Sequence, residues 1–269
     1  MQMKEFKIKW GMVIDIDKCT GCGACMVGCQ VENNIAPMTK KDPYNYVQAL
    51  TKDRDDASNK LKTLTWMNVY ELSNGKTFPE HETAYLPRPC MQCGTPACVP
   101  VCPVVATDKN EEGGIVSQIY PRCIGCRYCM AACPYHARYF NWWDPLWPEG
   151  MDKGLSPNAS VRPRGVVEKC SFCHSRYLDA KDKARQNGED PMDLPEDAYI
   201  PACAEICPTK AITFGDLNNP EHTVHQLAKG PHAFRLVEKL GLDPQVYYTS
   251  EREWVRLQGD NYNADGGGH

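Results

Sequence analysis

Sixteen cysteines are the residues of this chain whose type and spacing could do chemistry, and they form four groups of four. The groups are Cys19, Cys22, Cys25 and Cys29; Cys90, Cys93, Cys98 and Cys102; Cys123, Cys126, Cys129 and Cys133; and Cys170, Cys173, Cys203 and Cys207. Three groups end in a Cys-Pro pair, at Pro103, Pro134 and Pro208. An iron–sulfur cube needs four thiolates at the corners of a tetrahedron, so the groups predict four [4Fe–4S] clusters with no cysteine left over.

The spacing also predicts which cysteines share a cluster. A C-x2-C-x2-C loop wraps three thiols around one cube, and a fourth cysteine one helical turn further on faces away from it. In two-cluster bacterial ferredoxins that fourth cysteine binds the other cluster. We therefore expect the second and third groups, which only 20 residues separate, to exchange their fourth ligands, and the first and fourth groups to do the same. The expected sets are Cys19, Cys22, Cys25 and Cys207 (cluster 1), Cys170, Cys173, Cys203 and Cys29 (cluster 2), Cys90, Cys93, Cys98 and Cys133 (cluster 3), and Cys123, Cys126, Cys129 and Cys102 (cluster 4).

Three other uses of cysteine compete with this interpretation. Disulfides allow the even count but do not explain the Cys-Pro pairs. Zinc ribbons use C-x2-C pairs, but three cysteines within seven residues crowd a single tetrahedral ion. Cys170-Ser-Phe-Cys173-His174 is formally a c-type haem attachment motif, yet a haem there would leave Cys29, Cys203 and Cys207 without partners.

Strand-like and helix-like runs flank the cysteine groups and would position them. Alternation and β-branched residues predict strands over residues 12–16, 114–119 and 211–214. Short helices are expected over residues 223–228 and 232–240, the second stopped by Gly241. Residues 38–62 and 181–197 are charged and turn-rich, which is typical of surface loops, and the composition of residues 260–269 is typical of disorder.

Composition and charge exclude several classes of protein. Hydrophobic residues make up 42% and charged residues 24%, as in a soluble globular protein. No apolar stretch approaches the ~18 residues of a membrane span, and no signal peptide is recognisable at the N-terminus. The net charge of -4 gives no basic patch for nucleic acid. Four oxidised clusters of about -2 each would make the protein more acidic, and cations beside ligands in sequence could offset this. These cations are Lys18, Arg122, Arg127, Lys169 and Lys210.

The crossed pairing predicts the fold class and the division of the chain. We expect an α+β protein of two interleaved bacterial-ferredoxin-like modules with loop inserts and a C-terminal extension. Residues 10–36 and 161–220 would form the outer module, and residues 80–145 the inserted one. Residues 221–269 would form an extension that docks partners.

Over about residues 10–220 the cysteine motifs resemble those of one known family. The motifs are Cys19-Thr-Gly-Cys-Gly-Ala-Cys25 with Cys29-Gln-Val-Glu-Asn33, Cys90-Met-Gln-Cys-Gly-Thr-Pro-Ala-Cys98 with Cys102-Pro103, Cys123-Ile-Gly-Cys-Arg-Tyr-Cys129 with Cys133-Pro-Tyr135, and Pro201-Ala-Cys-Ala-Glu-Ile-Cys-Pro-Thr-Lys-Ala-Ile-Thr-Phe-Gly215. They are similar to the four-cluster iron–sulfur subunits of complex iron–sulfur molybdoenzymes, such as dimethyl sulfoxide, polysulfide and tetrathionate reductases. The crossed ligand pairing of that family agrees with the one argued above.

Within that family, one Trp- and Pro-rich segment resembles two assemblies most. Tyr139-Phe-Asn-Trp-Trp-Asp-Pro-Leu-Trp-Pro148, followed by residues 162–169, is similar to the menaquinone reductase complex of sulfate reducers and to alternative complex III. The resemblance implies a non-catalytic subunit with a linear chain of four clusters. Its partners would be a molybdopterin-family large subunit, an integral membrane subunit with a quinone site and a multihaem cytochrome c. In some relatives one cluster is a three-iron form, but all sixteen ligands are present here.

The resemblance also bears on location and leaves alternatives open. Iron–sulfur subunits of this family are often exported folded, bound to a partner with a twin-arginine signal. This implies the periplasmic face of the cytoplasmic membrane, with the cytoplasm as the alternative. The same relay in a polysulfide, tetrathionate or arsenate-type reductase, and a free cytoplasmic polyferredoxin, are the alternative functions. Trp142, Trp143 and Trp147 would either pack over a cluster or dock on the membrane partner.

Overall fold

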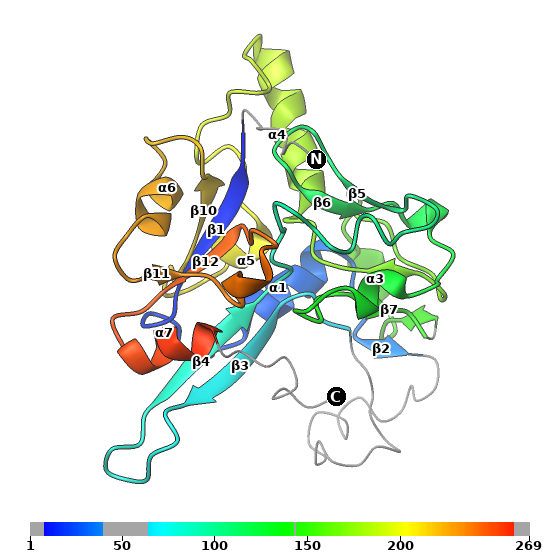
Figure 1. Cartoon of the computed structure of the whole chain (residues 1–269). Coiled ribbons are helices and arrows are strands. Elements are labelled where there is room, and N and C mark those ends of the chain that lie inside the picture. Colours follow the sequence, from blue (N-terminus) through cyan, green and yellow to red (C-terminus); the bar gives the residue numbers. More distant parts are fainter. Residues whose placement is uncertain (1–7, 40–63, 143, 261–269) are drawn as a thin grey trace.

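The computed structural model describes residues 8–39, 64–142 and 144–260, which include all sixteen cysteines (Figure 1). Helices and strands are both present, so the chain is a mixed α and β protein. The expected features at residues 40–62, Trp143 and residues 261–269 lie outside the described residues. No helix within the described residues is long and apolar enough to cross a membrane.

A four-stranded sheet joins the two ends of the described chain. Its order is β10 (Ile212–Asp216), β1 (Trp10–Asp15), β12 (Val246–Thr249) and β11 (Ala233–Phe234). β1 pairs antiparallel with β10, with Trp10 opposite Asp216, and parallel with β12, with Met12 opposite Val246. Strands expected at residues 12–16 and 211–214 are therefore confirmed within two residues at each end. This pairing brings the first and fourth cysteine groups to one side of the molecule.

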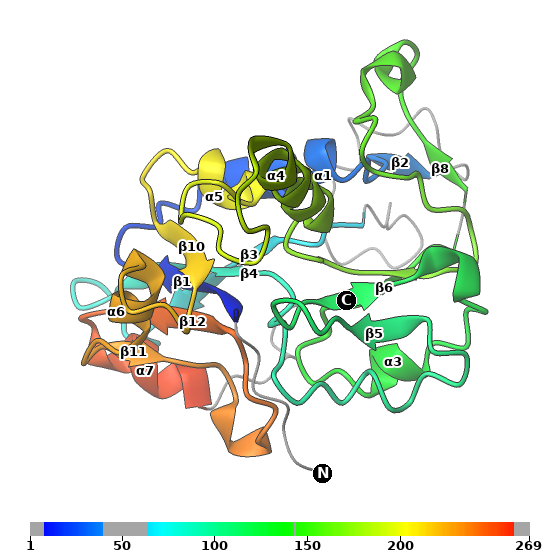
Figure 2. The ribbon, with the colours of Figure 1, turned by 90° about the horizontal axis from the view of Figure 1, so that it is seen from above.

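Helices cover this sheet (Figures 1 and 2). α1 (Ala24–Glu32) packs on α5 (Ala202–Glu205), and α5 also contacts β10. α6 (Thr223–Ala228) packs over β10 and β1, and its bounds are those expected from the sequence. α1 and α5 each contain the third cysteine of their group, so they bring Cys25 and Cys203 to the same region.

The elements around the third cysteine group lie on the other side of the molecule, at the right in both views (Figures 1 and 2). Here β5 (Thr107–Lys109) pairs with β6 (Val116–Gln118), and α3 (Tyr128–Ala131) carries Cys129. β6 confirms the strand expected at residues 114–119. The remaining elements are β2 (Met38–Thr39), β3 (Asn68–Ser73), β4 (Thr83–Arg88), η1 (Tyr120–Arg122), β7 (Tyr139–Phe140), β8 (Pro145–Leu146), η2 (Met151–Gly154), β9 (Val167–Glu168), α4 (His174–Asn187), η3 (Glu238–Leu240) and α7 (Glu253–Asp260).

Two expectations for the connecting segments are wrong in part. The loop expected at residues 181–197 begins only after α4, which runs to Asn187 and ends at Gly188 with a φ of 77°. Tyr177, Lys181 and Ala184 recur at helical spacing and are buried, which holds this charged stretch in a helix. Of the helix expected at residues 232–240, only the last turn forms, as the 3-10 helix η3, which ends at Gly241 as expected. Before it, β11 pairs with β12 and Val237 has a positive φ of 49°.

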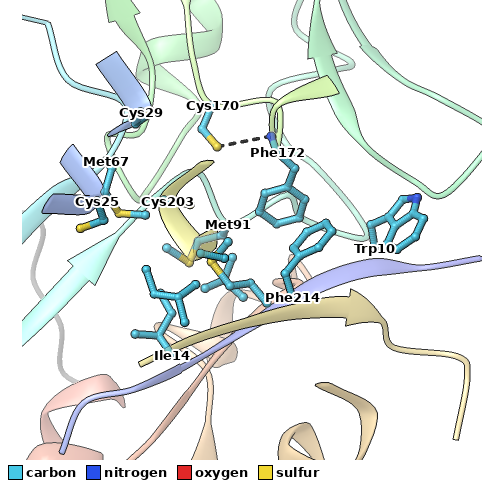
Figure 3. Close-up of a cluster of buried hydrophobic side chains, with 14 of the residues drawn as sticks. Trp10, Ile14, Cys25, Cys29, Met67, Met91, Cys170, Phe172, Cys203 and Phe214 are labelled. Atoms are coloured by element: carbon cyan, nitrogen blue, oxygen red, sulfur yellow. Dashed lines mark hydrogen bonds between the residues drawn. The ribbon is translucent and has the colours of Figure 1, made fainter. Parts of the chain in front are cut away.

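Aromatic side chains form the centre of the core between β1, β10 and α4. Trp10 stacks on Phe214 with ring centroids 5.5 Å apart, and it meets Tyr199 edge-on at 4.9 Å. Phe172, from the fourth cysteine group, meets Phe214 edge-on at 5.2 Å. Figure 3 shows Trp10, Phe172 and Phe214 in the same core as the buried Cys25, Cys29, Cys170 and Cys203. The aromatic core therefore holds the fourth cysteine group against the sheet.

This packing predicts that Trp10→Ala destabilises the protein. The side chain is 2% exposed, and truncating a large buried aromatic costs about 3–5 kcal/mol. We expect the apparent thermal unfolding midpoint of the cluster-loaded chain to fall by roughly 10 °C. Phe78→Ala, at a position 92% exposed, is the control and should leave the midpoint unchanged. Equal midpoints for the two variants would contradict the role of Trp10 in the core.

Candidate metal centres

The first C-x2-C pair of each cysteine group has the same backbone turn. In each of these four pairs the residue before the second cysteine has a positive φ. These residues are Gly21 (70°), Gln92 (47°), Gly125 (71°) and Phe172 (54°). A left-handed residue within such a turn points successive backbone N–H groups toward one concave side, which favours an anion there. The same turn therefore occurs four times, although only two of the four residues are glycines.

The three Cys-Pro motifs share a second turn. The third residue after each cysteine has a positive φ: Val105 (50°), His136 (46°) and Lys210 (52°). An alanine follows each of them, and its backbone N–H turns back to the cysteine. Ala106 donates to the Cys102 sulfur at 3.1 Å and Ala211 to the Cys207 sulfur at 3.3 Å, while the backbone of Ala137 hydrogen-bonds to Cys133. Each fourth cysteine thus receives a hydrogen bond that favours its thiolate form.

The first group lacks the proline and uses a side chain instead. α1 continues to Glu32, and Asn33 follows it at the position of the three alanines. The Asn33 amide nitrogen lies 3.8 Å from the sulfurs of both Cys29 and Cys173. One buried donor therefore serves two thiols that belong to different groups and lie far apart in the sequence.

Two cavities are each lined by four cysteines. One is lined by Cys19, Cys22, Cys25 and Cys207 together with Thr209 and Ala211. The other is lined by Cys102, Cys123, Cys126 and Cys129 together with Arg127 and Val167. These combinations match the sets expected for clusters 1 and 4, because each contains three thiols of one group and the last thiol of another.

The other eight thiols also lie in two groups, one around Cys29 and one around Cys93. Burial raises the pKa of Cys29 well above its ordinary value, and neighbouring thiols raise it further. These neighbours are Cys170, Cys173, Cys203 and, more weakly, Cys25. Burial likewise raises the pKa of Cys93, and the thiols of Cys90, Cys133 and Cys98 add to the shift. The structure thus brings together the residues expected for clusters 2 and 3.

Thiols in such an environment suit a cationic metal group. Burial raises the pKa of Cys25 to about 12, because four thiols share a space with little water. Cys207 and Cys102 differ: burial acts to raise the pKa of each, but several hydrogen bonds to the sulfur outweigh it and lower the pKa. Iron supplies the positive charge that lets all four deprotonate, since a metal-bound thiol loses its proton.

The thiols are not paired with one another by covalent bonds. All sixteen cysteines are free, so no disulfide joins them. Within the described residues, no group of three or more His, Cys, Asp and Glu side chains is arranged to hold a single metal ion. Four thiolates are the donor set that one [4Fe–4S] cubane takes. The donor sets therefore fit iron–sulfur cubanes, each held by four thiolates.

Comparison with known proteins agrees with this geometry. Residues 81–147 match the model of a 4Fe-4S dicluster domain, and residues 10–31 match that of a 4Fe-4S binding domain. The chain is 71% identical over 259 residues to the menaquinone reductase iron-sulfur cluster-binding subunit of Nitratidesulfovibrio vulgaris, covering 96% of this chain and 95% of the relative. The chain belongs to the iron–sulfur subunit family of complex iron–sulfur molybdoenzymes.

More distant relatives of this iron–sulfur subunit are also named as parts of reductases. It is 37% identical to the iron-sulfur subunit of a putative dimethyl sulfoxide reductase of Halobacterium salinarum, over 90% of this chain and 79% of the relative. It is 31% identical to one of the polypeptides of the polysulfide reductase of Wolinella succinogenes, over 91% of this chain and 95% of the relative. The iron–sulfur subunit carries four [4Fe–4S] clusters and transfers electrons.

The cations that adjoin ligands in sequence differ in their surroundings. Lys18, Arg122, Arg127 and Lys210 are exposed, and Lys18 forms an ion pair of 3.0 Å with Asp15. Only Lys169 of the five is buried.

A sixth cation, Arg138, lies closer to a ligand than any pattern in the sequence indicates. Its guanidinium donates to the Cys98 sulfur at 2.9 Å. Sequence reasoning missed it, because it does not adjoin a ligand. Arg138 lies two residues after His136, in the turn that follows Cys133, and this short distance from a ligand in the sequence could have identified it.

The aromatic insert lies beside one of the cysteine loops. Trp142 is 45% exposed and packs edge-on against Phe140 at 4.6 Å. The guanidinium of Arg127, next to Cys126, lies 4.6 Å from the Trp142 ring. Trp142 thus combines packing near the third cysteine group with an exposed face.

The shared turn predicts an effect of Gly125→Ala on iron binding. A Cβ at Gly125 would lie 2.3 Å from the Gly165 carbonyl oxygen, in addition to the unfavourable φ of 71°. We expect the purified variant to contain less iron per chain than the wild type. Gly23→Ala tests the effect of φ alone, because its φ is 73° and a Cβ there meets nothing within 4 Å. Full iron content in the Gly125 variant, measured by elemental analysis, would contradict the prediction.

Proposed function

We propose that this iron–sulfur subunit relays single electrons between a molybdopterin-family large subunit and an integral membrane subunit with a quinone site, in the reduction of menaquinone. A bound [4Fe–4S] cluster supplies reversible one-electron redox chemistry. The chain's own residues hold the thiolates, shield them from water and set the charge around them. No substrate pocket is needed for this role.

The proposal also assigns the sixteen ligands to four clusters. Cluster 1 would be held by Cys19, Cys22, Cys25 and Cys207, cluster 2 by Cys170, Cys173, Cys203 and Cys29, cluster 3 by Cys90, Cys93, Cys98 and Cys133, and cluster 4 by Cys123, Cys126, Cys129 and Cys102. The two four-cysteine cavities and the thiols around Cys29 and Cys93 support this assignment.

We number the four ligand sets 1 to 4 after their clusters. The observation that carries the relay is that the ligand sets of consecutive clusters lie close together. After burial, the thiols of Cys173, Cys170 and Cys25 raise the pKa of Cys203, and Cys25 belongs to set 1. Burial and then Cys90, of set 3, raise the pKa of Cys170, of set 2. Burial raises the pKa of Cys129, of set 4, and Cys98, of set 3, adds to it. Proximity in the order 1, 2, 3, 4 is what stepwise electron transfer along a row requires.

The crossed ligands imply two interleaved ferredoxin-like modules. Residues 10–36 with 161–220 would form the outer module, supported by the pairing of β1 with β10. Residues 80–145 would form the inserted module, supported by the β5–β6 hairpin and α3. Residues 221–269 would follow as an extension for partner contacts, and its exposed Leu240 suits that role.

Menaquinone and the partners are proposed from the family. The relative that is 71% identical over nearly its whole length is named as a menaquinone reductase subunit. By the same resemblance, a multihaem cytochrome c would supply electrons, and the complex would lie at the periplasmic face of the cytoplasmic membrane. Export bound to a partner would follow folding and cluster insertion.

Purification of the native protein in mild detergent tests this function. We expect it to elute far above 30 kDa with a molybdopterin-family subunit, a membrane subunit and a haem-staining cytochrome. Elution near the mass of the single chain would contradict the relay complex and favour a free polyferredoxin. A complex with a membrane subunit but without haem would contradict the cytochrome donor and favour another reductase of the family.

Two cysteine variants test the crossed ligand sets. Cys207→Ala should damage the cluster held by Cys19, Cys22 and Cys25, because Cys207 lines that cavity. Cys29→Ala should damage the cluster held by Cys170, Cys173 and Cys203 instead. Electron paramagnetic resonance of the reduced variants should therefore lose two different cluster signals. If both variants lose the same signal, the crossed assignment is wrong.

A further inference from the structure

Lys169 and Arg138 are buried cations with no carboxylate partner among the described residues. Lys169 is 0% exposed, and its ammonium donates to the carbonyl oxygens of Val116 and, at 2.6 Å, Cys170. Arg138 is 3% exposed, and its guanidinium donates to Thr107 at 3.1 Å, to Gln118 at 2.9 Å and to the Cys98 sulfur at 2.9 Å.

Two other buried cations in the described part of the chain are neutralised within the protein. Arg162 pairs with Glu168 at 2.6 Å, with both side chains 3% exposed. Lys181 pairs with Glu112. Burying a charge without a counter-charge is strongly unfavourable, so Lys169 and Arg138 require negative charge from another source. Thiolate-held clusters, each with a net charge of about -2, are that source.

Each of the two cations lies where two ligand sets meet. The Lys169 ammonium donates to the carbonyl oxygen of Cys170, in set 2. The same oxygen accepts a hydrogen bond at 2.7 Å from the side chain of Gln92, which lies between Cys90 and Cys93 of set 3. In keeping with this position, the charge of Lys169 acts against the burial that raises the pKa of both Cys93 and Cys170. Burial raises the pKa of Cys129, in set 4. The positive charge of Arg138 and a hydrogen bond from its side chain to Cys129 act against that shift. Arg138 also holds the Cys98 sulfur, in set 3. Lys169 therefore adjoins sets 2 and 3, and Arg138 adjoins sets 3 and 4.

The junction between sets 1 and 2 is different. α1 carries Cys25 of set 1 and Cys29 of set 2, and the neutral amide of Asn33, just after α1, lies near the sulfurs of Cys29 and Cys173, both of set 2. The nearby cation, Arg176, pairs with Glu32 at 2.7 Å and with Glu205 at 2.5 Å, so its charge is already balanced. Lys169 and Arg138 thus place their positive charge at the two junctions on either side of set 3.

We propose that Lys169 and Arg138 are electrostatic tuning residues that raise the reduction potentials of the clusters on both sides of them. The inference rests on the ligand sets of the proposed function. A cluster that gains an electron gains negative charge, so a fixed cation beside it stabilises the reduced form. Set 3 adjoins both cations and receives both contributions, whereas set 1 receives neither.

Redox titration of neutral variants tests this tuning. Lys169→Met and Arg138→Met would be titrated in the full-length cluster-loaded protein, followed by electron paramagnetic resonance. Each should lower two of the four midpoint potentials. At a fixed applied potential, the ratio of reduced to oxidised cluster should fall on the order of tenfold, which is 59 mV for a one-electron couple. The double variant should shift three potentials, one of them by the sum of the single effects, and leave the fourth unchanged.

Matched variants separate charge from structure. Lys169→Arg and Arg138→Lys keep the charge and should stay close to the wild-type potentials. Lys18→Met and Arg122→Met remove exposed cations that also adjoin ligands, and they should leave all four potentials unchanged. The tuning would be overturned if the neutral variants assemble all four clusters but keep the wild-type potentials. It would also be overturned if the exposed controls shift the potentials equally. Neither result would overturn the relay. Fewer than four clusters in the wild-type protein would overturn the proposed ligand sets, and the tuning with them.

Discussion

Sixteen thiolates must be turned toward four shared metal groups, and the backbone around every cysteine is arranged to meet this requirement. The residue before the second cysteine of each group has a positive φ, whether that residue is Gly21 or Phe172. The turn after each Cys-Pro pair returns an alanine N–H toward the sulfur, as at Ala106 and Ala211. Larger elements follow from the same requirement. The pairing of β1 with β10 brings together the first and fourth cysteine groups, which are far apart in the sequence.

Charge is the second consequence of gathering so many thiolates. Burial raises the pKa of most of the inner thiols, so the isolated protein disfavours the state that binds iron, and metal and nearby cations must stabilise it. The chain places exposed cations near its outer cysteines, where water already screens charge. It places Lys169 and Arg138 in the interior, where a fixed charge acts strongly because screening is weak. The two side chains therefore link cluster binding, which supplies their counter-charge, to the proposed tuning of electron transfer.

The sequence predicts the ligands better than their surroundings. The cysteine spacing indicates the number and type of clusters, and alternation locates β1, β6 and β10, because these patterns are local. It does not reveal Arg138, which reaches Cys98 from 40 positions away through the folded structure. Nor does it reveal the left-handed turns at Gln92 and Phe172, since residues with side chains rarely adopt them and only the surrounding fold imposes the conformation. The charged stretch after Lys181 becomes a helix for a similar reason, because burial of one face outweighs its polar composition.

The proposed arrangement is a row of four cubanes, each held by three cysteines of one group and one cysteine of another. Anomalous diffraction at the iron edge, from crystals of the anaerobically purified protein, tests it most directly. We expect four separate iron peaks. Cys207 should lie beside the peak that Cys19, Cys22 and Cys25 surround, and Cys29 beside the peak that Cys170, Cys173 and Cys203 surround. An iron peak that both Cys25 and Cys29 ligate would contradict the crossed ligand sets. Only two iron peaks in the whole chain would contradict the row of four clusters.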